Sequence, residues 1–123
     1  MKIAFDFGGV INETPELQEL AKSLLIAGNE VFIISIAFET ENREEMVRKL
    51  GIPFSGIFVV LEDGKINHGE EKLKIMKEIG CNIIFDDNVE VINVVRKAGM
   101  IGLHVFNPNV HNHKNKELRV MEI

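Results

Sequence analysis

The chain has 123 residues, 46% of them hydrophobic and 27% charged, with a net charge of −5 and one cysteine. These values are typical of one globular domain, expected to span residues 1–123. The acidic net charge argues against nucleic-acid binding. No apolar run approaches the ~20 residues that a membrane-spanning helix needs. The single cysteine cannot form an internal disulfide. Because the chain starts directly with a strand-like run, we expect no signal peptide and a cytoplasmic location.

The first element is the apolar run at residues 3–11, Ile-Ala-Phe-Asp-Phe-Gly-Gly-Val-Ile, which is typical of a buried strand of a parallel sheet. Asp6 lies where this strand would leave the sheet, at the edge where open α/β sheets place ligands. Gly8 and Gly9 allow a sharp turn and a close approach of the backbone to a ligand. Two interpretations stay open here: a reactive or metal-binding carboxylate, or a capping aspartate before an ordinary glycine turn.

A loop over residues 12–14 separates this strand from the first predicted helix, which begins with Thr14 and Pro15 in the order expected of an N-cap and a first helical residue. The next buried strand is predicted over residues 31–34 and ends in Ser35. The later elements repeat the alternation of helix and strand: a helix around residues 46–50, a strand over 57–61, a helix after residues 68–70, a strand over 83–85 that ends in Asp86 and Asp87, a helix over 91–98 and a strand over 101–106.

This alternation predicts an α/β fold: a three-layer sandwich with a central five-stranded parallel sheet and helices on both faces. Right-handed connections place the carboxyl ends of all strands at one edge of the sheet, so Asp6, Ser35, Asp86 and Asp87 should meet there. Two carboxylates ~4 Å apart repel by about 4 kcal/mol at an effective dielectric near 20, unless a cation compensates. Oxygen ligands of this kind suit Mg²⁺. Consecutive residues of a strand face opposite ways, so Asp86 and Asp87 should have different roles.

The order of these elements resembles the haloacid dehalogenase-like (HAD) superfamily of phosphohydrolases over nearly the whole chain. Four segments carry the resemblance: Phe5-Asp6-Phe7-Gly8-Gly9-Val10-Ile11 resembles the first motif of the family, Phe32-Ile33-Ile34-Ser35 the second, Lys72 (with Lys74 as its rival) the third, and Ile83-Ile84-Phe85-Asp86-Asp87-Asn88 the fourth. Each motif is weak alone, but their order and their places at strand ends make the set specific.

The resemblance implies a phosphatase in which Asp6 attacks phosphorus and forms an aspartyl-phosphate. It implies that Mg²⁺ is held by Asp6, the backbone carbonyl of Gly8 and Asp87. A metal and a covalent intermediate together are consistent with two-step phosphoryl transfer.

The remaining roles follow from the same resemblance. Ser35 and Ile36 would bind phosphoryl oxygens, and Lys72 would neutralise the nucleophile and the transferred group. Asp86 would position the lysine or a water molecule, with Asn88 as a supporting residue.

One position departs from the family pattern. Gly8 stands where the family has a second aspartate, which protonates the leaving group and later activates water, a role typically worth 10²–10⁴-fold. We therefore expect slow turnover, a long-lived intermediate or a leaving group that needs no proton, unless another group substitutes. Asn12, Glu13 and His68 are the candidates by sequence.

The chain also resembles the type of the family without a cap domain, because its loops after the first and third strands are short. An open site favours large or macromolecular phosphorylated substrates, or a lid supplied by a second subunit in a homo-oligomer.

Two other functions compete with the phosphatase. A catalytically degenerate domain would bind metal, a phosphorylated ligand or a protein partner, and Gly8 favours it. A receiver-like switch is disfavoured, because receivers carry the acidic pair after the first strand. Cys81 is interpreted as a small core residue, His104 as a half-buried histidine with a satisfied hydrogen bond, and His111 and His113 as a weak metal-binding pair in the tail.

Overall fold

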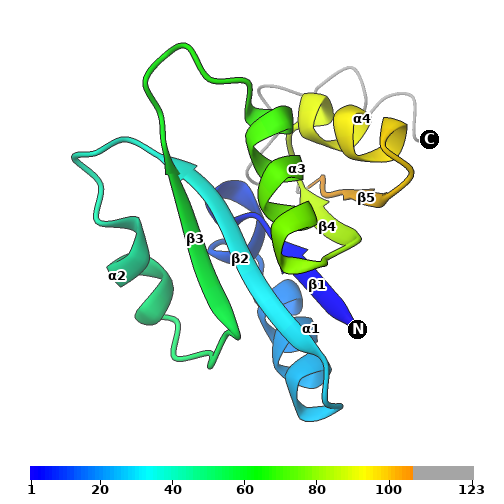
Figure 1. Cartoon of the computed structure of the whole chain (residues 1–123). Helices are drawn as coiled ribbons and strands as arrows, with labels where there is room; N and C mark the ends of the chain where they lie inside the picture. Colours follow the sequence, from blue (N-terminus) through cyan, green and yellow to red (C-terminus); the bar gives the residue numbers. More distant parts are fainter. Residues whose placement is uncertain (107–123) are drawn as a thin grey trace.

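Residues 1–106 are described by a computed structural model, and within this range five parallel strands form one sheet in the order β3-β2-β1-β4-β5 (Figure 1). The strands are β1 (Lys2–Phe5), β2 (Glu30–Ala37), β3 (Gly56–Leu61), β4 (Ile83–Asp86) and β5 (Ile101–His104). The helices are α1 (Pro15–Ile26), α2 (Arg43–Arg48), α3 (His68–Ile79) and α4 (Val89–Lys97). A short turn segment, η1 (Phe7–Ile11), follows β1 and is not helical at Gly8 and Gly9. The predicted tail histidines, His111 and His113, lie outside the described residues.

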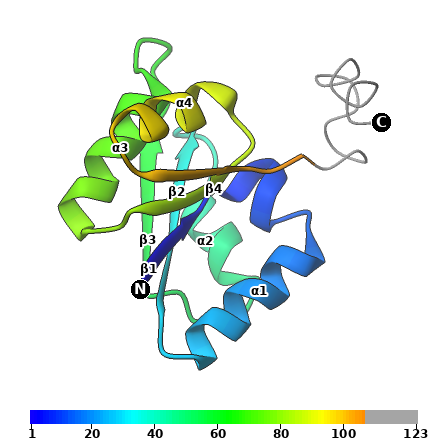
Figure 2. The same cartoon turned by 90° about the vertical axis from the view of Figure 1, so that its right-hand side faces the viewer.

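Alternate residues of the central strands point to opposite faces of the sheet and build two cores. Ile33 of β2 packs on the side of α1 and α2, where Ala21 and Val47 are buried. Ile34, its neighbour, packs on the side of α3 and α4, against side chains such as Met76. Burial of one such large side chain contributes roughly 1.5–3 kcal/mol. The predicted sandwich with helices on both faces is confirmed (Figure 2).

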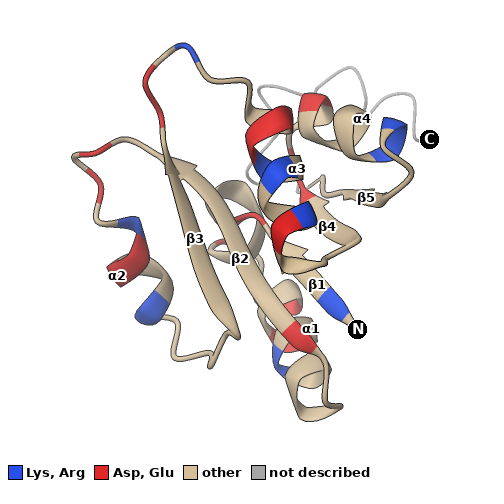
Figure 3. Ribbon diagram, in the orientation of Figure 1, with Lys and Arg blue, Asp and Glu red and all other residues tan. Residues whose placement is uncertain are grey.

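Charged side chains lie on the helices, in the loops and at the strand ends, whereas the middles of the strands carry none (Figure 3). Cys81 is 1% exposed and its Sγ donates to two backbone carbonyls, so its interpretation as a core residue is confirmed. Among residues 1–106, no helix combines the length and the apolar character that a membrane crossing requires.

The order of the strands places the first and fourth strands side by side at the centre of the sheet. β1 is followed towards one edge by β2 and β3, and the chain then crosses back to place β4 on the other side of β1. The strand order therefore reverses between β1 and β4, and such a reversal opens a crevice at the carboxyl ends of the strands. Receiver domains of the CheY type have a different order, 2-1-3-4-5.

The segment after β1 differs from the prediction. The strand ends at Phe5, next to its predicted exit at Asp6, but η1 fills residues 7–11, so the connection before α1 is longer than the predicted residues 12–14. Gly9 has a φ of 72°, a conformation that glycine adopts readily, and its N–H donates to Asn12 Oδ1 at 2.9 Å. The two glycines turn the chain after the strand, although the surrounding residues are apolar.

Two strand ends also differ from the prediction. β2 does not end at Ser35, because Ile36 and Ala37 continue the pairing with β3. β5 ends at His104 and not at residue 106. His104 is exposed rather than half-buried, because β5 is an edge strand, and its Nε2 lies 3.1 Å from the backbone oxygen of Asp87.

A close contact between α3 and α4 makes Gly69→Ala a test of this packing. A Cβ on Gly69 would lie 2.7 Å from Val94 Cγ2 and 2.9 Å from Val94 Cβ. We expect the overlap, which costs about 1–3 kcal/mol, to outweigh the ~1 kcal/mol that alanine gains over glycine in a helix. Urea unfolding measures the difference. Lys74→Ala, at an exposed position of the same helix, serves as the control and should change stability little.

Candidate functional site

Asp6 is the residue that leaves the central strand at the reversal point. Its backbone is extended, with φ −67° and ψ 158°, and its N–H donates to Phe85 O at 2.9 Å, so it stays attached to β4. Asp6 is two residues after Ala4, which places its side chain on the face covered by α3 and α4. The residue is 9% exposed.

Lys72 of α3 connects two carboxylates from neighbouring strands. Its Nζ donates to Asp6 Oδ1 at 2.8 Å and to Asp86 Oδ2 at 2.7 Å, and its side chain is 4% exposed. The two predicted lysines differ in position: Lys72 lies on the buried side of α3 one helical turn before Met76, whereas Lys74 is exposed. Only Lys72 of the two lies between the carboxylates.

The acidic pair that ends β4 completes the cluster. Asp86 is fully buried, and its Oδ1 accepts a hydrogen bond from the Asn88 N–H at 2.9 Å. Asn88 in turn accepts from Glu90 N at 2.9 Å and caps α4. Asp87 follows the strand and is half-buried, and one carboxylate oxygen each from Asp6, Asp86 and Asp87 lie within 4.8 Å of one another. The expected divergence of Asp86 and Asp87 therefore does not separate their carboxylates, because the chain already turns at Asp87.

Burial, and the attraction of Lys72 that opposes it, dominate the electrostatics of this cluster. Burial raises the pKa of Asp6 to about 7, against the opposing effect of Lys72, and the nearby carboxylate of Asp86 raises it further. Burial likewise raises the pKa of Asp86, although Lys72 lowers it. Burial disfavours the charged form of Lys72, but the two carboxylates outweigh it and raise the pKa of the lysine above its usual range. Lys72 is therefore charged, whereas burial makes the ionised forms of Asp6 and Asp86 less favourable.

The pKa of Asp6 predicts how stability depends on pH in the absence of metal. The pKa of Asp6 is about 7 in the folded protein, above the usual 3.8. The stabilising contribution of neutral Asp6 is therefore complete below pH 3.8 and is lost as the pH rises through 7. We expect wild type to lose on the order of 2 kcal/mol relative to Asp6→Asn between pH 5 and pH 8. Urea unfolding of both proteins in EDTA measures this difference. A difference that is the same at both pH values would contradict it.

The donor set fits a divalent cation. With all groups ionised, three carboxylates and Lys72 leave a net charge of −2, and three oxygen donors within 4.8 Å of one another can share one ion. Hard oxygen ligands select Mg²⁺, Mn²⁺ or Ca²⁺ over softer metals. Asp6, Asp87 and Asp86 are thus the side chains that could hold a metal.

The cluster faces a cavity of about 310 Å³. Nearly all of the predicted site residues line this cavity, which is formed by Asp6, Gly8, Ile36, Arg43, His68, Lys72, Asp86, Asp87 and Asn88. Ser35 does not line it: the residue is fully buried, and by alternation its side chain lies on the face of the sheet opposite Asp6. Its Oγ accepts a hydrogen bond from Arg43 Nη1 at 2.8 Å.

Asn12, Glu13 and His68 are the candidates to replace the acid–base group that Gly8 lacks. Of these three, only His68 lines this cavity. Its Nε2 contacts the carboxylate of Glu62. A hydrogen bond from the Gly64 N–H is the largest cause that lowers the pKa of Glu62, and the contact with His68 lowers it further. Asn12 bonds to the Gly9 N–H, and Glu13 lines a different cavity.

Sequence reasoning missed Arg43. It follows a loop rich in glutamate, and nothing in its local pattern distinguishes it from a solvated charge at a helix start. Its proximity to the site follows from the pairing of β2 with the rest of the sheet.

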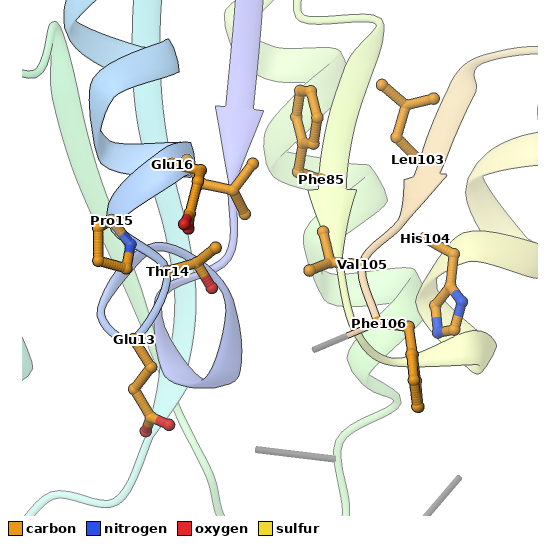
Figure 4. Close-up of a pocket in the computed structure, with 10 residues that line it drawn as sticks. Glu13, Thr14, Pro15, Glu16, Phe85, Leu103, His104, Val105 and Phe106 are labelled. Atoms are coloured by element: carbon orange, nitrogen blue, oxygen red, sulfur yellow. The ribbon is translucent and has the colours of Figure 1, made fainter. Parts of the chain in front are cut away.

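A larger cavity, of about 600 Å³, lies between the start of α1 and the ends of β4 and β5 (Figure 4). It is lined by Glu13, Thr14, Pro15, Glu16, Leu17, Phe85, Leu103, His104, Val105 and Phe106. Among these residues there is no lysine or arginine to bind an anion and no group of three metal ligands. We therefore place the candidate site at the smaller cavity, on the chemistry of its side chains.

Comparison with known proteins shows similarity of fold. No family model matches the sequence, and no curated protein is significantly similar to it. One similar solved structure is a chain of the Pnkp1/Rnl/Hen1 complex, with 14% identity and a TM-score of 0.65 over 85% of this chain and 47% of that one. This chain thus spans about half the length of that relative.

Two further structures match over most of both chains. A protein of the universal stress protein family from Burkholderia pseudomallei has 16% identity and a TM-score of 0.55, covering 85% of this chain and 94% of that one. The core domain of a predicted phosphoglycolate phosphatase from Streptococcus pneumoniae TIGR4 has 13% identity and a TM-score of 0.60, covering 99% and 95%. The similarity establishes an α/β fold that is also found in a phosphatase-like core domain.

Proposed function

We propose that this chain is a Mg²⁺-dependent phosphoric monoester hydrolase of the HAD-like type, acting through an aspartyl-phosphate on Asp6. The observation that carries the proposal is the position of Lys72, which bonds Asp6 and Asp86 at 2.8 and 2.7 Å while Asp87 lies within reach of a shared ion. A nucleophile, a cation and a metal site in one cavity are what phosphoryl transfer requires.

Each side chain has a defined task in this proposal. A carboxylate oxygen of Asp6 attacks phosphorus, and the bond from phosphorus to the leaving oxygen breaks. Lys72 holds Asp6 in place and offsets charge on the transferred phosphoryl group. Water then cleaves the aspartyl-phosphate, which releases phosphate and regenerates Asp6. A magnesium ion held by Asp6, Asp87 and the Gly8 carbonyl would supply Lewis-acid stabilisation of phosphoryl oxygens.

A second candidate function is binding of a metal or a phosphorylated ligand without turnover. Gly8 favours it, because this position lines the cavity and offers no side chain for acid–base chemistry. A domain of this kind would bind inorganic phosphate or Mg²⁺ at the same residues but would form no covalent intermediate.

The partner in either case is a phosphorylated small molecule or macromolecule. Within residues 1–106 the connections after β1 and β3 carry no inserted domain, which supports a large substrate or a lid from a second copy in a homo-oligomer.

Phosphoenzyme formation distinguishes the two functions. The protein is incubated with acetyl phosphate or p-nitrophenyl phosphate, with Mg²⁺ or with EDTA, and intact mass and phosphate release are measured. The hydrolase gains the mass of one phosphoryl group and releases phosphate only with Mg²⁺. Binding of phosphate without label or turnover would instead support the second function.

A further inference from the structure

We propose that Arg43 is the anion-recognition group of this cavity, and that it selects phosphorylated substrates whose leaving group departs as an anion. Acyl phosphates, aryl phosphates and phosphoanhydrides belong to this class, whereas alkyl phosphates do not. The inference rests on the proposed function and names the substrate class of the same site.

Three contacts fix the guanidinium of Arg43 at the wall of the cavity. Nη1 donates to Ser35 Oγ and Nη2 donates to Glu41 Oε2, each at 2.8 Å, and Cζ lies 5.0 Å from the centre of the Phe7 ring. The side chain is 11% exposed. A long, flexible side chain is thus held in one orientation before any ligand binds, which lowers the entropic cost of binding.

The donors of this guanidinium are only partly used. Arginine has five N–H groups, and two of them make the hydrogen bonds to Ser35 and Glu41. Nε is buried and has no hydrogen-bond partner among the described residues. An unsatisfied buried donor is costly and calls for an explanation, and a role of this side chain in binding an anion is one.

Arg43 also provides a positive charge that is separate from the carboxylate cluster. Lys72 is occupied by Asp6 and Asp86, and a metal would offset the remaining charge of the cluster. Arg43 makes no ion pair with that cluster; its partner is Glu41, which is partly exposed. The cavity therefore has a carboxylate side that could hold a metal and, at Arg43, a separate cationic wall.

The cationic wall lies beside Gly8. A Cβ built on Gly8 would lie 3.6 Å from Arg43 Nη1, so a side chain at this position would point at the guanidinium. Arginine keeps its proton in proteins and cannot protonate a leaving oxygen. It can stabilise one that leaves with the electron pair of the broken bond. Asp6 then forms the new bond to phosphorus, the leaving oxygen takes the electron pair as an anion, and no proton moves in that step.

The test compares leaving groups of different basicity. Values of kcat/KM with Mg²⁺ are measured for acetyl phosphate, p-nitrophenyl phosphate, phenyl phosphate and glycerol 3-phosphate, in wild type, Arg43→Lys and Arg43→Met. We expect wild type to prefer the first two over glycerol 3-phosphate by at least about 10²-fold, the size of an acid-catalysis contribution. Arg43→Met should lose about 10²-fold on the first two, and Arg43→Lys less, because it keeps the charge but not the planar fork.

A structural role for Arg43 is distinguished by chemical rescue. Guanidinium chloride at a non-denaturing concentration should restore part of the activity of Arg43→Met, which a misfolded protein would not show. Arg48→Met, an exposed arginine of the same helix that pairs with Glu44, is the matched control and should match wild type.

Two results would overturn the inference while leaving the hydrolase intact. One is turnover of glycerol 3-phosphate within tenfold of the aryl esters, above all if His68→Gln abolishes it, because His68 would then supply a proton. The other is activity that is indifferent to Arg43→Met. Absence of both phosphoenzyme and turnover with every substrate would overturn the proposed function itself, and the inference with it.

Discussion

Replacing Asp6 with asparagine is expected to abolish phosphoenzyme formation and to reduce turnover by at least about 10³-fold. The amide keeps the shape of the side chain but is a poor nucleophile, and it can still accept a hydrogen bond from Lys72. Intact mass after incubation with acetyl phosphate and Mg²⁺ measures the first effect, and phosphate release measures the second. The loss would come from the chemistry and not from the fold, which circular dichroism checks.

Asp63→Asn is the matched control for this experiment. Asp63 is exposed, lies in the loop between β3 and α3, and bonds the backbone N–H groups of Lys65 and Ile66. It should keep both label and turnover. Label that persists in Asp6→Asn would place the phosphoryl group on another residue and contradict the assignment of the nucleophile.

Lys72→Met is expected to cost about 3–5 kcal/mol of folding free energy near neutral pH, and to abolish activity. The substitution leaves the carboxylates of Asp6 and Asp86 buried and facing each other without their shared cation. The cost should shrink as the pH falls, because the carboxylates then become neutral. Urea unfolding at pH 5 and pH 8 measures both the size and the trend.

Lys74→Met separates the two lysines that the sequence left as rivals. Lys74 is exposed two residues further along α3, so its loss should change stability by less than about 0.5 kcal/mol and leave phosphoenzyme formation intact. Equal effects of the two substitutions would show that the contacts of Lys72 contribute little. A larger effect of Lys74→Met would transfer the role to Lys74.

Much of the fold could be predicted because its signals are local. The apolar runs at β1, β2 and β4 are too short for buried helices and are separated by segments of helical period, which is the pattern of a parallel sheet covered on both faces. The errors occurred where a local pattern was ambiguous. Residues 7–11 are apolar enough for a strand, yet the conformation of Gly9 turns them into η1.

The candidate site was predictable only in part, for a related reason. Asp6, Asp86 and Asp87 stand at strand ends, and the parallel topology brings such ends to one edge. Ser35 also follows an apolar run, but β2 continues beyond it through pairing with β3, which the sequence of β2 alone does not reveal. Arg43 has no local signal at all.

The sequence by itself determined the layered α/β architecture and the carboxylates at the ends of β1 and β4, because hydrophobic period and strand ends are properties of short segments. Only the tertiary structure decided that β4 lies beside β1, that Lys72 rather than Lys74 lies between Asp6 and Asp86, and that Arg43 borders the same cavity. These depend on pairings between residues far apart in the chain. A pairing of that kind is set by the free energy of the whole packed structure. The local sequences of the two paired segments therefore do not reveal it.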